Sequence, residues 1–186
     1  MELLSSALKP QKRCWPAWGV ACALGLFAPP PWAQDTTMTP GERELKVAFI
    51  YNFIRFTDWP EDTGNPLTLC VRGPDPFGTP LDALQGKGVG ARTLAIQRRG
   101  NEPLKGCQAV FIGSSVFAAW PKTILELQGR PVLTLADTPG AARQGVHLNM
   151  AVVQNKVTFE ANLVSARAAQ LKLNSQLLRL ATEVIQ

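Results

Sequence analysis

The residues able to carry acid–base or nucleophilic chemistry are few and isolated in this sequence. His147 is the only histidine, and it stands in the alternating segment GVHLNMAV without a neighbouring carboxylate or nucleophile. The chain has no GxSxG motif, no HExxH motif and no cluster of carboxylates. Catalysis requires groups with matched pKa values within reach of one another. We therefore interpret His147 as a half-buried strand histidine and expect a protein that is not an enzyme, with no cofactor and no metal site.

A second group of functional side chains is polar and lies near the C-terminus. Glu160 and Arg167 are seven residues apart, which places them on one face if the segment is helical. Together with Asn162 and Ser165 they would form a patch able to bind a partner or a small anion. The alternative is an ordinary solvated helix face. The sequence alone leaves both interpretations open.

Two cysteines, Cys70 and Cys107, lie beyond the N-terminal leader described below. An even pair in an exported protein favours a disulfide over two free thiols. Closing a loop of about 38 residues would contribute roughly 4 kcal/mol to stability. The alternative is a pair of buried thiols that never meet. Because the pair is not a CxxC motif, the sequence does not indicate disulfide exchange of the thioredoxin type.

The first 33 residues have the pattern of a secretory signal peptide. Three basic residues precede an apolar, uncharged run at residues 14–28, and Ala33 suits cleavage. The run of about 15 residues is shorter than the roughly 20 needed to span a bilayer, which favours cleavage over a membrane anchor. We therefore expect a cleaved signal peptide at residues 1–33 and a single domain at residues 34–186.

The rest of the chain carries a small positive charge. The leader holds three basic residues and one acidic residue, so its loss lowers the formal net charge from +5 to +3. The remaining basic residues are scattered, and only Arg98 and Arg99 are adjacent. Nucleic-acid recognition requires a denser positive surface. We therefore expect no nucleic-acid partner.

The order of the predicted elements favours an α/β fold. Thr39 and Pro40 predict the start of a helix that runs to about Asp58, because Trp59 precedes a proline. The expected fold is a single compact three-layer sandwich with a mixed, largely parallel sheet, an N-terminal aromatic helix and C-terminal helices. Strands are predicted at residues 67–73, 93–99, 107–113 and 131–137, with an edge hairpin joined at Gln154 and Asn155. Helices are predicted at residues 79–86, 114–128 with Ser114 and Ser115 as caps, 161–173 and 176–185.

The N-terminal helix is apolar almost all round. Phe49, Phe53 and Phe56 fall on one face, and Ile54 falls roughly opposite, with Tyr51 toward one flank. A helix with this pattern is buried on more than one side. One face is expected to join the core, and the second lies under the C-terminal helices or stays exposed for a partner. Tyr51 and Ile54 are therefore further candidates for partner or ligand contact.

Four segments together resemble the YfiR-like family of periplasmic proteins. They are ELKVAFIYNFIRFTDWP, LTLCVRGPDPFG, LKGCQAVFIGSS and VTFEANLVSARAAQLKLNSQLLRLATEV, and they run from about Glu42 to Val184. The resemblance implies that residues 34–186 form a compact α/β domain located in the periplasm. It also implies a regulator that is not an enzyme.

The resemblance further implies a function. Such proteins bind the periplasmic sensory domain of an inner-membrane diguanylate cyclase and hold the cyclase inactive, which lowers cyclic di-GMP signalling and biofilm formation. An OmpA-like outer-membrane lipoprotein and a second copy in a homodimer are further implied partners. The alternative is a periplasmic receptor for a small ligand, an anion or a nucleotide.

The cysteines also enter the resemblance. Cys70 and Cys107 match the family's cysteine pair in two strands. A second pair, present in some members near the C-terminal hairpin, is absent here because residues 144–153 contain no cysteine. Any redox switch of the family type would therefore depend on Cys70 and Cys107 alone.

Overall fold

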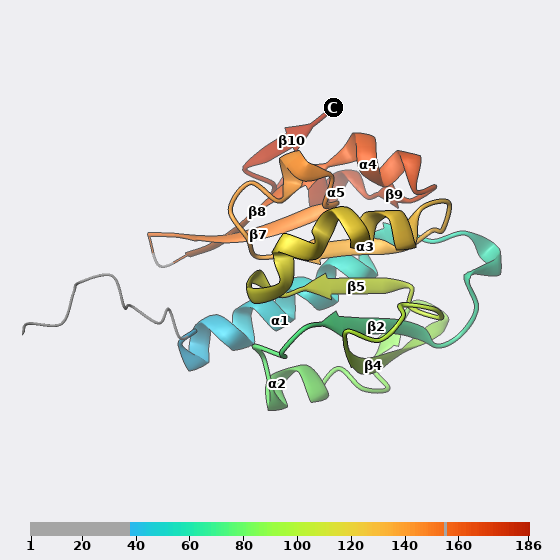
Figure 1. Ribbon diagram of the computed structural model, residues 1–186, viewed down its shortest axis with the longest axis horizontal. Helices are drawn as coiled ribbons and strands as arrows, with labels where there is room; N and C mark the ends of the chain where they lie inside the picture. Colours follow the sequence, from blue (N-terminus) through green and yellow to red (C-terminus); the bar gives the residue numbers. More distant parts are fainter. Residues whose placement is uncertain (1–37, 155) are drawn as a thin grey trace, which may run out of the picture. The chain divides into compact units, whose positions relative to one another are not determined.

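The computed structural model describes residues 38–154 and 156–186, and the predicted signal peptide lies outside them. The described chain contains an eight-stranded mixed sheet and a separate two-stranded sheet (Figure 1). The strand order in the large sheet is β10-β8-β7-β6-β5-β2-β4-β3. The strands are β2 (Leu67–Arg72), β3 (Gly88–Val89), β4 (Arg92–Gly100), β5 (Ala109–Ile112), β6 (Leu133–Ala136), β7 (Leu148–Val153), β8 (Lys156–Asn162) and β10 (Glu183–Ile185).

The centre of the large sheet is parallel. β2 pairs in parallel with β4 on one side and with β5 on the other, and β6 continues the parallel order from β5 to β7. The β7–β8 hairpin is antiparallel. Every residue of β5 and β6 is buried, as expected for strands covered on both faces. The predicted α/β class with a largely parallel sheet is confirmed.

Helices cover both faces of this sheet and complete the three layers (Figure 1). Side chains alternate across the sheet, so Leu69 and Phe111 belong to one apolar cluster while Cys70 and Val110 belong to another. The first cluster packs α1 (Pro40–Arg55) and α2 (Thr79–Asp82) against the sheet, and the second packs the 3-10 helix η2 (Ser114–Ala119) and α3 (Trp120–Leu127).

Helix α1 begins where the sequence predicts and ends earlier than expected. The Thr39 side chain accepts a hydrogen bond from the Glu42 amide, and Pro40 occupies the first turn. The helix ends at Arg55 rather than near Asp58, because residues Thr57–Asp58 form β1 and pair with β9 (Lys172–Leu173).

The described residues include no helix with the length and apolar character needed to cross a membrane.

The predicted serine caps are wrong. Ser114 and Ser115 lie inside η2 with exposed side chains, and Gly113 occupies the cap position without a side-chain hydrogen bond. The backbone of Gly113 is tied to the strand end instead, because its amide donates to the Arg72 carbonyl at 3.2 Å. The contact between strand ends sets the start of this helical segment.

The C-terminal region differs most from the expectation. The predicted helix at residues 161–173 is reduced to α4 (Leu163–Ala168), because β8 continues through Asn162. The predicted helix at residues 176–185 is reduced to α5 (Ser175–Leu178), followed by β10. β10 pairs with β8, so the β7–β8 hairpin is not at the edge of the sheet. Partners distant in the sequence supply the hydrogen bonds that here override helix propensity.

Candidate partner-binding surface

The predicted patch around Glu160 and Arg167 does not form on one helix. Glu160 lies in β8, whereas Arg167 lies in the last turn of α4. The expected helical spacing between them is therefore wrong. The cause is the register of β8, which pairs Glu160 with Asn149 of β7 and with Glu183 of β10.

Asn162 is a buried structural residue. Its side-chain oxygen accepts a hydrogen bond from the Ser165 amide at 2.8 Å, and its side-chain nitrogen donates to the Ala142 carbonyl at 2.8 Å. Only 5% of the residue is exposed. Asn162 therefore caps α4 and joins it to the 3-10 helix η3 (Ala142–Gln144).

Glu160 belongs to a line of polar side chains that crosses β7, β8 and β10 and ends at η3, which we call the polar strip. The Asn149 side chain donates to a Glu160 carboxylate oxygen at 3.2 Å and accepts from the Thr138 amide. The neighbouring Glu183 accepts two hydrogen bonds from Arg143, at 3.0 and 3.1 Å. The strip is the four residues Asn149, Glu160, Glu183 and Arg143.

Helix α4 adds an exposed cation beside this edge of the sheet. Arg167 is exposed, and in the part of the chain that the structure describes it forms no ion pair. Val164 on the same helix is 52% exposed. Ser165 is half-buried and faces a cavity next to α3. Arg167 and Val164 are therefore accessible to a partner.

The two candidates on α1 have different environments. The Tyr51 hydroxyl donates to the Gly88 carbonyl at 2.7 Å, and the Lys87 ammonium lies 4.6 Å from the centre of the Tyr51 ring. Tyr51 is half-buried and borders an open groove between α1 and α2. Ile54 is fully buried in the core. Tyr51 can therefore contribute to a surface, whereas Ile54 supports α1 from inside.

The second face of α1 lies partly under the C-terminal segment. Phe49 and Phe56 are half-buried and line a cleft of about 220 Å³ together with Leu177 of α5 and Leu180. Leu180 itself is 73% exposed. Leu180 is not among the candidates that the sequence indicates, because the predicted helix at residues 176–185 does not define its neighbours. The apolar SQLLRL run was the only signal for it.

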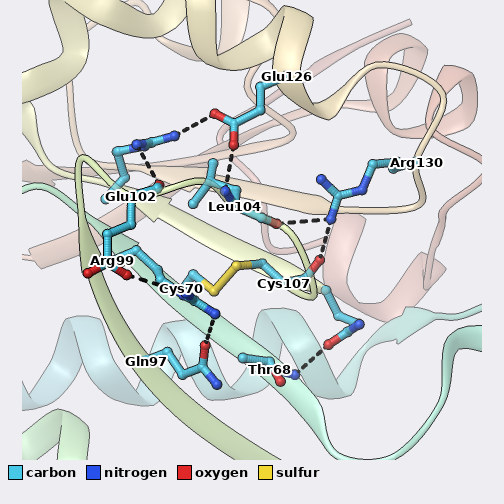
Figure 2. The surroundings of a disulfide bond; sticks show 11 residues. Thr68, Cys70, Gln97, Arg99, Glu102, Leu104, Cys107, Glu126 and Arg130 are labelled. Atoms are coloured by element: carbon cyan, nitrogen blue, oxygen red, sulfur yellow. Dashed lines mark hydrogen bonds and ion pairs between the residues drawn. A yellow bond between two sulfur atoms is a disulfide. The ribbon is translucent and has the colours of Figure 1, made fainter.

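The predicted disulfide is confirmed. Cys70 of β2 and Cys107, just before β5, are bonded with their Cα atoms 5.8 Å apart. Both residues are buried. Figure 2 shows that the surrounding loop is held by charged side chains from α3 and beyond. Arg130 donates to the Leu104 carbonyl at 2.9 Å and to the Cys107 carbonyl at 3.5 Å, and Glu126 accepts from the Leu104 amide.

His147 is more buried than expected, with 5% exposed. Its Nδ1 atom accepts from the Thr134 amide at 3.1 Å. Burial lowers the pKa of His147 to about 4, and a hydrogen bond to the Ser165 backbone opposes that shift. Across residues 38–154 and 156–186, no three His, Cys, Asp or Glu side chains gather closely enough to hold a metal ion. His147 lies just before β7 rather than in a strand, and it ties that point of the chain to Thr134 of β6.

Comparison with known families decides the identity of the chain. A model of the YfiR/HmsC-like family matches residues 43–182. The chain belongs to this family. Members of the YfiR/HmsC-like family are generally regulatory rather than catalytic. The match spans most of α1, both disulfide cysteines, the β7–β8 hairpin and α4, so the resemblance noted in the sequence is confirmed.

Proposed function

We propose that this protein is a periplasmic regulator that binds the periplasmic sensory domain of an inner-membrane diguanylate cyclase and holds the cyclase inactive. The observation that carries this proposal is the YfiR/HmsC-like family match over residues 43–182. Repression lowers cyclic di-GMP, and with it biofilm formation. An OmpA-like outer-membrane lipoprotein and a second copy of the chain are proposed as further partners.

Location in the periplasm is supported by two features of the chain. Residues 1–33 have the composition of a cleaved signal peptide, which would leave residues 34–186 as the mature domain. The bond between Cys70 and Cys107 suits an oxidising compartment, where disulfides form and persist.

We propose that the contact with the cyclase is made by the accessible residues of the polar strip, Glu160, Glu183 and Arg143, and by α4. Glu160 and Arg167 provide opposite charges, and Val164 provides exposed apolar area between strand and helix end. Ser165 contributes from the same helix, and Tyr51 is a second candidate contact on α1. Asn162 and Ile54 are buried, so they act by positioning α4 and α1 rather than by touching the partner.

Co-purification from membranes tests this contact. The tagged protein should retain a diguanylate cyclase from detergent-solubilised membranes of its own cells. Arg167→Glu and Glu160→Lys should each weaken retention, because rim charges set the complementarity of an interface. Lys156→Glu reverses an exposed charge at the hairpin tip and is the matched control. The proposal would be contradicted if Lys156→Glu were the only variant that lost retention of the cyclase, or if the wild type retained no cyclase.

A further inference from the structure

A cavity of about 320 Å³ lies between α3 and α4, on the sheet face that also carries the disulfide. This volume is at the small end of the roughly 300–1,000 Å³ typical of ligand pockets. Its inner walls are apolar side chains that belong to or adjoin the second core, and it is not part of the proposed cyclase contact except at Ser165. The wall residues used below are Trp120, Leu127, Val132 and Ala169.

The floor of the cavity is polar and uncharged. His147 and Thr134 form it and bond to each other twice: the Thr134 amide donates to Nδ1 at 3.1 Å, and the His147 amide donates to the Thr134 hydroxyl at 3.0 Å. Burial lowers the pKa of His147 to about 4, so the imidazole is neutral at physiological pH. A floor with satisfied, neutral groups suits the uncharged part of a ligand, because a buried unpaired charge is costly.

The mouth of the cavity combines exposed apolar side chains with one cation. Ile124 and Leu125 are 40% and 70% exposed, although both line the cavity. Arg130 also lines it, and within the described residues its guanidinium has no carboxylate partner. The hydrogen bonds found for this side chain, to the Leu104 and Cys107 carbonyls, both use Nη2. Its other N–H groups remain for an anion.

We propose that this cavity binds a small organic monocarboxylate. The aromatic ring or branched chain of the ligand fills the apolar space between α3 and α4. The ligand carboxylate forms a bidentate pair with the Arg130 guanidinium, which is the arrangement in which guanidinium groups bind carboxylates most strongly. The neutral floor at His147 selects against a second charged group at the far end of the ligand. The site shares only Ser165 with the proposed cyclase contact, and the binding measurements below use other residues, so either proposal can fail without the other.

Titration calorimetry of the purified protein with phenylacetate tests this site. We expect saturable binding of phenylacetate. The neutral analogue phenylacetamide should bind with about tenfold lower affinity, because it loses the charge of the group that accepts the Arg130 hydrogen bonds. Indole-3-acetate and 4-methylpentanoate extend the probe series to a larger ring and to a branched chain. Absence of saturable binding for all three carboxylates at millimolar concentration overturns the proposal, as does equal affinity for phenylacetate and its amide.

Two variants locate the binding. Leu125→Glu places a negative charge at the mouth and should weaken phenylacetate binding about tenfold or more. Leu180→Glu is the matched control, because Leu180 is 73% exposed and lies outside the cavity; it should leave affinity unchanged. Arg130→Gln should also weaken phenylacetate binding. Because Arg130 holds the loop before β5, the circular dichroism spectrum of this variant must first match that of the wild type. Equal effects of the two leucine substitutions would place the ligand elsewhere and contradict the assignment.

Discussion

Phe53 of α1 meets Phe159 of β8 edge-on, with ring centroids 4.9 Å apart. Both rings are fully buried. Phe49 approaches both from the outer side of α1, at 5.8 Å from Phe53 and 6.0 Å from Phe159. These three rings attach the aromatic helix to the β7–β8 hairpin. The hairpin in turn carries Glu160, so the position of the proposed partner surface depends on this contact.

Truncation of the two helix phenylalanines should therefore have unequal effects. Phe53→Ala removes a fully buried ring and should lower the free energy of unfolding by about 3–5 kcal/mol. Phe49→Ala removes a half-buried ring and should cost less than half of that. Urea denaturation monitored by circular dichroism measures both values. Equal losses for the two variants would show that Phe53 is not the inner ring of the cluster.

The disulfide should stabilise the fold measurably. Cys70 and Cys107 are separated by 37 positions in the sequence, and a bridge of this span contributes about 4 kcal/mol in the chain-entropy description. The double variant Cys70→Ala/Cys107→Ala should unfold at lower urea concentration than the oxidised wild type. Added reductant should lower the wild-type midpoint and leave that of the double variant unchanged. A wild-type midpoint insensitive to complete reduction would contradict a stabilising role.

His147 should make the stability depend on pH. Its folded pKa of about 4 lies below the ordinary value of 6.5, so the unfolded chain binds a proton that the folded protein excludes. The contribution of His147 to the free energy of unfolding is complete above about pH 6.5. It is lost as the pH falls toward 4, by roughly 3 kcal/mol in total. Denaturation at several pH values measures the slope.

A variant isolates this contribution from the carboxylates. His147→Asn keeps an acceptor for the Thr134 amide and removes the titrating ring. His147 is the only histidine of the chain, so no other histidine contributes to the difference. The variant should show a flatter stability profile than the wild type between about pH 6.5 and pH 4. Identical slopes for the two proteins would refute the assignment.

The buried ion pair between α1 and the end of β6 should behave unlike a surface pair. Lys46 lies 2.9 Å from Asp137, with side chains 7% and 9% exposed. Lys46→Met leaves the Asp137 carboxylate buried without its cation and should lower the free energy of unfolding by about 3 kcal/mol or more. Adding Asp137→Leu should recover much of that loss. Arg143→Met removes one partner of an exposed pair and is the control, expected to cost under about 1 kcal/mol. Additive losses in a double-mutant cycle would contradict coupling between Lys46 and Asp137.

The predictable part of the fold is the part that local pattern determines. The apolar runs of β2, β5 and β6 predict these strands, because strands buried on both faces are continuously apolar. The start of α1 was recognised from Thr39 and Pro40, which act through local hydrogen bonds and fixed backbone geometry. Burial of α1 on more than one side followed from its apolar surface, and Ile50, Phe53 and Ile54 are fully buried.

The unpredictable part depends on partners distant in the sequence. The sequence pattern predicts helix for residues 172–173 and 183–185, yet they pair with β1 and with β8. The same pairing placed Glu160 in a strand and separated it from the helix that carries Arg167. The cavity beside Arg130 could not be inferred either, because its walls come from α3 and α4, which meet only in the folded chain.

The central claim is that the protein holds a membrane diguanylate cyclase inactive. Cyclic di-GMP measured by mass spectrometry in cells that carry the cyclase, with and without the gene for this protein, tests that claim most directly. Deletion should raise cyclic di-GMP, expression of the wild type should restore the low level, and cells that also lack the cyclase should show no change. Unchanged cyclic di-GMP after deletion in cells with an intact cyclase would contradict the account.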